Sequence, residues 1–189
     1  MNATVAVTPA GTKVKWDIYP RHSEINFTTY QSVFTKIKGH FNGFGGSVQI
    51  EDSTISGLDF NLWINPASIT TGNDLRNEYL RGEDSFDTDK YKIITYNGAS
   101  LKRSGREFLY ESQGLLTIKN VTRVVRFEVD FIGEMKDPSG RQRIGFYIKG
   151  NLNRKHWNLY SKKQFDIVKD MLGNSDILID GKLQFVREF

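Results

Sequence analysis

The chain has 189 residues, carries a formal net charge of +4 at pH 7, and is 38% hydrophobic. This length suits a single domain with a sizeable core, and the absence of cysteine excludes disulfides, thiol chemistry and cysteine-based metal sites. No apolar run reaches the ~18 residues that a membrane-spanning helix needs. The small positive charge fits a solvated surface and also permits attraction to an anionic headgroup or polymer.

The first residues predict a flexible arm ahead of one domain. Residues 1–13 are small and polar-leaning, with Pro9 and Gly11, so we place the domain at 14–189. The arm has neither the basic region nor the long apolar region of a signal peptide. We therefore expect a cytoplasmic protein, or a periplasmic one if Met1 replaces a native signal.

Most of the domain alternates apolar and polar residues, a pattern typical of half-buried strands. We expect eight to ten strands, within residues 14–18, 23–30, 39–50, 58–64, 93–101, 107–118, 125–131, 144–152 and 177–185. Glycines between residues 39 and 46 predict a bulge or a sharp bend, which barrels use at corners. Together with the sequential hairpins, they favour an all-β antiparallel barrel. A barrel of eight strands has room inside for side chains or for one small ligand.

The alternation stops between residues 66 and 97. Thr71, three residues before Asp74, resembles the start of a capping box, and Gly82 stands where a helix ends. We predict a short helix lying across the end of the barrel. A loop containing Phe86 should follow it and lead back into a strand.

The inward faces of the expected strands are rich in phenylalanine: Phe27, Phe60, Phe127, Phe131, Phe146 and Phe185. One interpretation is a fully packed core. The other is a cavity for a long apolar ligand, because such sites combine apolar walls with a few placed polar groups. The residue types leave both interpretations open.

Several short sequence blocks follow one another in a specific order and spacing between Trp16 and Phe185. They lie at residues 16–18, 22–27, 39–41, 44–46, 67–71, 73–76, 80–87, 114–122, 137–138, 143–146 and 153–157. Together these blocks resemble the YceI-like family of bacterial polyisoprenoid-binding proteins. The resemblance implies an extended lipocalin-like antiparallel barrel, with a short helix and loops at its mouth. It also implies an isoprenoid or similar lipid in the interior, and a homodimer.

The chain departs from the family pattern at three places. Asn120 stands where the family often has glycine, and His156 with Trp157 replaces the usual acid–aromatic pair. The segment 155–173 is longer, carries Lys162, Lys163 and Lys169, and predicts a long loop with a helical turn near the mouth. These changes bear on the identity of the ligand more than on the fold.

We expect the ligand tail to lie along the interior and the headgroup to lie at the mouth. Arg76 and Arg154 are the expected headgroup donors, since a guanidinium fork suits phosphate and similar oxygens; the alternative for each is a solvated charge. Apolar residues around the helix and loops, Leu159 among them, would plug the mouth or gate it. The expected ligand-binding residues are Phe27, Phe41, Phe44, Phe60, Arg76, Leu80, Phe86, Phe127, Phe131, Phe146, Arg154 and Trp157.

Other function classes have weaker support. A fatty acid or fatty amide could occupy the same cavity. The sequence has neither a G-x-S-x-G elbow nor a phosphate-binding glycine loop, and Asp84, Asp87 and Asp89 fit a solvated loop better than a calcium site. Lys and Arg are spread along the chain instead of forming a groove for nucleic acid. We expect no catalysis, cofactor, metal or nucleic acid, and at most transient contact with a membrane.

Overall fold

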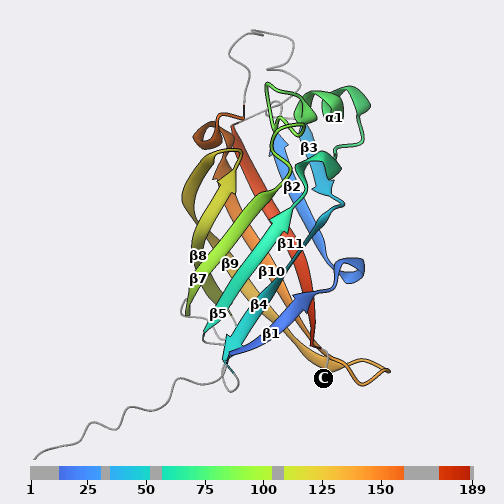
Figure 1. The fold of residues 1–189 in the computed structure, drawn as a ribbon, viewed down its shortest axis with the longest axis vertical. Coiled ribbons are helices and arrows are strands. Elements are labelled where there is room, and N and C mark those ends of the chain that lie inside the picture. Colours follow the sequence, from blue (N-terminus) through green and yellow to red (C-terminus); the bar gives the residue numbers. More distant parts are fainter. Residues whose placement is uncertain (1–12, 31–34, 52–56, 104–108, 160–174, 188–189) are drawn as a thin grey trace, which may run out of the picture.

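Strands closed into a barrel make up most of the described chain (Figure 1). The computed structural model describes residues 13–30, 35–51, 57–103, 109–159 and 175–187; the expected arm, apart from Lys13, and most of the expected loop at 155–173 lie outside them. The strands are β1 (Lys13–Ile18), β2 (Glu24–Tyr30), β3 (Lys36–Phe41), β4 (Phe44–Glu51), β5 (Leu58–Ile64), β6 (Ile69–Thr70), β7 (Ile94–Arg103), β8 (Leu109–Ile118), β9 (Val121–Lys136), β10 (Gln142–Asn153) and β11 (Asp176–Arg187). All pairs are antiparallel, in the order β1-β4-β5-β7-β8-β9-β10-β11-β2-β3-β6, and β1 also pairs with β11. The predicted antiparallel barrel is confirmed.

Three of the barrel strands are broken in the middle, which explains why the sheet has more segments than the expected eight to ten. The 3₁₀ turn η1 (Pro20–His22) separates β1 from β2, and η2 (Pro66–Ser68) separates β5 from β6. The third break is at Asn42 and Gly43, between β3 and β4. Proline interrupts a strand because it has no N–H to donate to the ladder. The two segments of the first broken strand, β1 and β2, remain aligned with each other. Both pair with β11, β1 through Phe185 and β2 through Lys182. Counted in this way, the barrel closes with eight strands.

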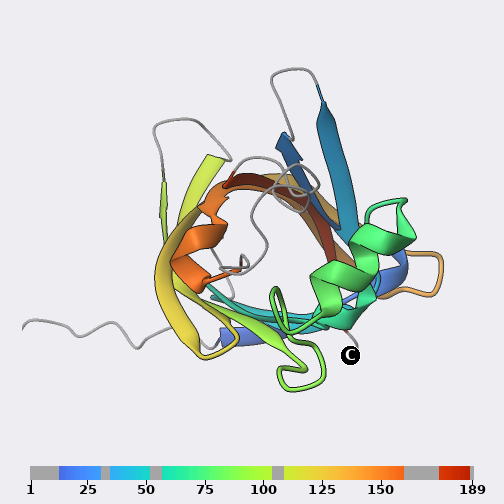
Figure 2. The same ribbon diagram turned by 90° about the horizontal axis from the view of Figure 1, so that it is seen from above.

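The helix α1 (Asp74–Arg81) covers the place where the upper part of the barrel lacks a strand pairing. β5 pairs with β7, whereas β6 pairs with β3. The chain between β6 and β7 carries α1, which lies on the rim of the barrel (Figure 2). None of the helices in the described ranges has the length and apolar character to cross a membrane.

The predicted helix and its end at Gly82 are confirmed, but the expected start at Thr71 is wrong. Asn73 is the N-cap: its side chain accepts a hydrogen bond from the N–H of Arg76, at 2.9 Å. Thr71 instead donates from its N–H and its hydroxyl to the side-chain oxygen of Asn77. An asparagine one residue before the first helical turn is as good a cap as threonine, and the polar Asn77 inside the helix provides Thr71 with another partner.

The end of the barrel away from α1 is solid. The side chains of Phe146, Phe185, Val48, Leu58 and Leu183 have no measurable exposure there. The rings stack in pairs: Phe146 lies 5.8 Å from Phe60, 5.6 Å from Phe131 and 6.0 Å from Phe185, centroid to centroid. We call Phe131, Phe146 and Phe185 the plug, because their edge-to-face and tilted packing fills the width of the barrel.

A buried ion pair fixes the β9–β10 hairpin to η1. Arg143 donates from Nε and Nη2 to one carboxylate oxygen of Asp137, at 3.0 and 2.7 Å, and its guanidinium carbon lies 4.5 Å from the centre of the Tyr19 ring. Nη1 of Arg143 also donates to Gln184, and His22 bonds the same Gln184 side chain. His22 is therefore part of this structural network.

This network should make stability depend on acidity. The hydrogen bonds from Arg143 lower the pKa of Asp137 from 3.8 to about 2, while burial acts in the opposite direction. Because the folded pKa is the lower one, the contribution is complete above the ordinary pKa and is lost as the pH falls toward about 2. We expect Asp137→Asn to lower the urea midpoint most at neutral pH and progressively less in acid. Asp17→Asn, which breaks an exposed pair with Lys15, is the control and should give a small change. A difference between wild type and Asp137→Asn that stays constant with pH would contradict the assignment.

Candidate functional site

Above the plug, the barrel encloses an apolar cavity of about 160 Å³ that opens toward α1. Its walls are mostly aliphatic and aromatic side chains from β2, β3, β5 and β7 to β11. Among the described residues, the polar side chains that line it are few, namely Thr29, Thr71, Arg76, Ser85, Tyr96, Ser112 and Arg154. The interior therefore combines the two interpretations that the sequence left open: the closed end is a packed core, and the end toward α1 holds a cavity.

The cavity brings together nine of the twelve expected ligand-binding residues. Phe27, Phe41, Phe60, Arg76, Leu80, Phe86, Phe127, Arg154 and Trp157 all line it. Phe131 and Phe146 belong to the plug, because their positions on β9 and β10 lie nearer the closed end. Phe44 is buried in the core cluster but does not line the cavity. Alternation identified the inward face of each strand, but it carries no information on height along the barrel.

At two places on the cavity wall, a phenylalanine ring lies against a glycine on the neighbouring strand. Phe27 pairs directly with Gly39, and the ring of Phe127 lies against Gly150. A Cβ at either glycine would lie within 2.7 Å of a ring carbon, which is a severe overlap. Without a Cβ beneath it, each ring lies along the wall and leaves the lumen free. The glycine-rich stretch that predicted a bend thus has a second role at Gly39.

Two arginines stand at the open end of the cavity. Arg76 comes from α1, and its Nε is buried with no hydrogen-bond partner among the described residues. Arg154 begins the 3₁₀ turn η3 (Arg154–Trp157). Two contacts hold this turn in place: the side chain of Asn153 caps it, and the backbone N–H of Arg154 donates to the carbonyl oxygen of Ser175. Burial lowers the pKa of the Arg154 guanidinium from its ordinary value, against the influence of nearby Tyr79. A half-buried guanidinium at an apolar cavity is suited to a polar oxygen group.

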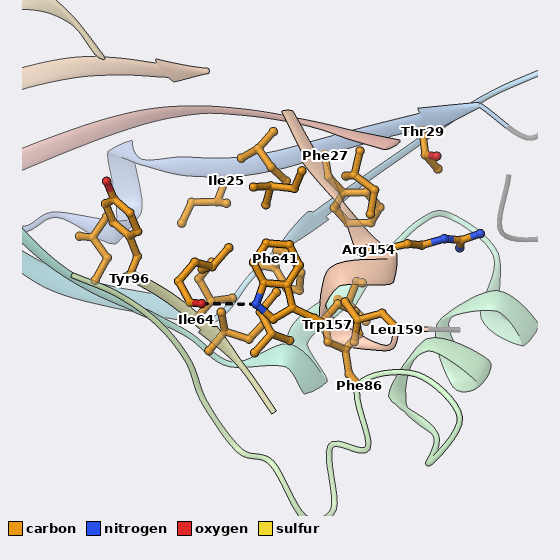
Figure 3. A pocket seen from close by; sticks show the side chains of 18 of the residues that line it. Ile25, Phe27, Thr29, Phe41, Ile64, Phe86, Tyr96, Arg154, Trp157 and Leu159 are labelled. Atoms are coloured by element: carbon orange, nitrogen blue, oxygen red, sulfur yellow. Dashed lines mark hydrogen bonds between the residues drawn. The ribbon is translucent and has the colours of Figure 1, made fainter. Parts of the chain in front are cut away.

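Trp157 reaches from η3 into the cavity, where its indole lies among the other lining side chains (Figure 3). The indole is 2% exposed and donates from Nε1 to the carbonyl oxygen of Leu116, at 3.3 Å. Phe41 and Phe86 meet edge to face at 6.2 Å on the α1 side of the mouth. These contacts narrow the opening. Whether the apolar side chains at the mouth block it or gate it stays a prediction.

Sequence reasoning missed the polar residues at the bottom of the cavity. Tyr96 on β7 and Ser112 on β8 form a buried hydrogen bond of 2.6 Å between their hydroxyls. Burial raises the pKa of Tyr96, with the hydrogen bond to Ser112 acting in the opposite direction. The available signal was a serine at an inward position of a strand whose other inward residues include Leu116 and Ile118.

The described part of the chain holds no group of three or more histidine and acidic side chains that could bind a metal ion. Asp84, Asp87 and Asp89 follow α1 in a series of turns. The backbone N–H of Asp87 donates to the carbonyl oxygen of Gly82 in the first of them.

Comparison with known proteins places the chain among barrels of one kind. The model of the YceI-like domain matches residues 16–185. A UPF0312 protein of Staphylococcus aureus is 30% identical over 165 residues, which cover 87% of this chain and 92% of the relative. The protein YceI of Shigella flexneri is 30% identical over 145 residues, covering 77% and 75%.

Solved structures show the same fold at lower identity. BcnA of Burkholderia cenocepacia superposes with a TM-score of 0.75 at 20% identity, covering 88% of this chain and 98% of that one. A domain from Saccharophagus degradans, described as polyisoprenoid-binding and implicated in plant cell wall breakdown, superposes with a TM-score of 0.68 at 17% identity and covers 92% and 98%. At these identities the likeness concerns the fold.

Proposed function

Because the chain belongs to the YceI-like family, we propose that it binds a polyisoprenoid or a similar long-chain amphipathic lipid in the barrel, without catalysis. The observation that carries the proposal is the apolar cavity closed by the plug at one end and flanked by two arginines at the other. The polyisoprenoid-binding domain of Saccharophagus degradans shares this fold, which supports the choice of ligand class.

The cavity suits the tail of such a ligand. Each methylene-sized unit moved from water to an apolar wall stabilises the complex by roughly 0.8 kcal/mol before the entropy of ordering the chain is subtracted. The headgroup lies at the mouth, where Arg76 and Arg154 donate to it. The cost of partly burying two guanidinium groups is then offset by hydrogen bonds to the ligand.

The direct test is native mass spectrometry of protein purified from its own cells, followed by organic extraction of whatever remains bound. We expect a mass increase that disappears on extraction, and a long-chain lipid in the extract. A fatty acid or fatty amide in the extract would favour that alternative for the same cavity. Protein that carries nothing, and that takes up no lipid when mixed with it, would refute the proposal.

We also propose that the protein stores or carries its ligand as a homodimer and contacts membranes only transiently. The homodimer and the carrier role are implied by the family resemblance. Light scattering at several protein concentrations measures the dimer, and cosedimentation with lipid vesicles measures the membrane contact. A monomer at all concentrations, or stable sedimentation with vesicles, would contradict the corresponding part.

A further inference from the structure

At the bottom of the apolar cavity, two strands hold the polar hydroxyls of Tyr96 and Ser112 in a defined position. Gly98 on β7 pairs with Phe60, whose ring packs against Phe146 and Phe185 of the plug. Tyr96 points toward this level, since a Cβ at Gly98 would lie 2.9 Å from its hydroxyl oxygen. We call the hydroxyls of Tyr96 and Ser112 the floor pair. Figure 3 shows Tyr96 and Arg154 at opposite ends of the drawn side chains.

Two glycines make room for the floor pair. Gly98 and Gly114 stand opposite each other on β7 and β8. A Cβ at Gly98 would lie 2.8 Å from the hydroxyl oxygen of Ser112, and a Cβ at Gly114 would lie 2.8 Å from Cε2 of Tyr96. The phenol therefore occupies a position created by Gly98 on β7 and by Ser112 and Gly114 on β8. Its ring is also held by Phe127, which meets it edge to face at 5.2 Å.

The floor pair has one more hydrogen to donate than it uses. Two hydroxyls carry two hydrogens, and the 2.6 Å bond between them uses one. Within the described ranges, no other acceptor bonds either oxygen. A buried donor left without an acceptor is costly, whereas a pair of apolar residues of the same shape would not be. The second hydrogen is therefore available to a group that enters the cavity.

The charges that line the cavity limit which chemical group can accept this second hydrogen. The cations among the described lining residues are Arg76 and Arg154, which come from α1 and η3 at the mouth. An anion at the floor would lose its hydration without a countercharge. The raised pKa of Tyr96 keeps its phenol protonated and able to donate. A neutral oxygen acceptor needs no countercharge and can accept the hydrogen bond that the phenol donates.

We propose that the floor pair donates a hydrogen bond to a neutral oxygen at the buried end of the bound chain. This inference rests on the proposed function and narrows its ligand class. The ligand is a long apolar chain with a carbonyl, ether or hydroxyl oxygen at the end that enters first. A more polar or anionic group lies at the other end, beside the two arginines.

The test compares two probes of equal shape: the isoprenoid methyl ketone farnesylacetone and the hydrocarbon with the same carbon skeleton. Either hydroxyl can donate alone, so the informative protein is the double variant Tyr96→Phe/Ser112→Ala. Both changes keep an apolar filling of nearly the same volume, so the fold should persist. Tyr147→Phe, on the outer face of β10, is the matched control. Dissociation constants come from displacement of an apolar fluorescent reporter.

We expect the double variant to bind the ketone about 3- to 10-fold more weakly than the wild type does, the size of one ordinary hydrogen bond. Binding of the hydrocarbon should change by less than about twofold, and Tyr147→Phe should change neither. In infrared spectra, the ketone carbonyl stretch should lie at lower frequency in the wild-type complex and return toward its value in hydrocarbon solvent in the double variant.

The outcomes separate this inference from the function beneath it. Equal effects of the double variant on both probes, or none on either, would overturn the floor site and leave lipid binding intact. An unshifted carbonyl stretch in the wild type would overturn it as well. Failure of wild-type protein to bind either probe would overturn both proposals together.

Discussion

Phe127→Asp should reduce lipid uptake by more than tenfold, and by more than Arg76→Ala does. Phe127 is 8% exposed and lines the cavity between Tyr96 and the wall at Gly150. A carboxylate there would either remain charged without a partner or take up a proton and leave a polar group unpaired. Either state opposes the entry of an apolar chain. Arg76→Ala removes one donor at the mouth and leaves the interior unchanged.

Uptake is measured as lipid bound per folded protein after incubation with radiolabelled isoprenoid, with near-ultraviolet circular dichroism to establish the folded fraction. Phe127→Trp tests the same site without adding a charge, because the larger ring should fill the lumen and so lower uptake as well. Phe127→Leu is the control that keeps the wall apolar. Equal uptake by Phe127→Asp and Arg76→Ala would count against a tail site in the interior.

Gly150→Ala should make the cavity smaller by pushing the Phe127 ring away from the barrel wall. The added Cβ would lie within 2.7 Å of Phe127, so the ring must turn into the lumen or the strands must separate. Overpacking of this kind typically costs about 1–3 kcal/mol of the free energy of unfolding. We expect lower stability together with weaker lipid binding, measured by urea unfolding and by reporter displacement.

A double variant separates the two effects. Gly150→Ala/Phe127→Leu replaces the clashing ring with a smaller side chain, so it should recover much of the stability and the binding. Gly145→Ala on the same strand is the matched control, since its Cβ would meet Ile132 at an ordinary 3.5 Å. If Gly150→Ala binds lipid as the wild type does, the ring–glycine contact does not set the width of the cavity.

The candidate site could be read from the sequence only as far as local patterns reach. Alternation placed Phe27, Phe60 and Phe127 inward. Arg76, on the predicted helix, and Arg154 were expected at the mouth because guanidinium groups suit a polar headgroup. The structure brings all five to one cavity. The floor pair was missed. A serine among apolar inward residues has no functional meaning until a tyrosine from the neighbouring strand lies 2.6 Å away.

The sequence by itself determined the antiparallel barrel, the short helix ending at Gly82 and the inward faces of the strands, because period-two patterning and turn residues act over a few neighbours. Only the tertiary structure decided that Phe131 and Phe146 fill one end while Phe27 and Phe127 line a hollow at the other. That difference depends on which residue stands across the ladder. Phe27 and Phe127 face glycines, whereas Phe131 pairs with Phe146, whose ring packs on it and on Phe185. Such pairings join residues far apart in the chain, so no local pattern records them.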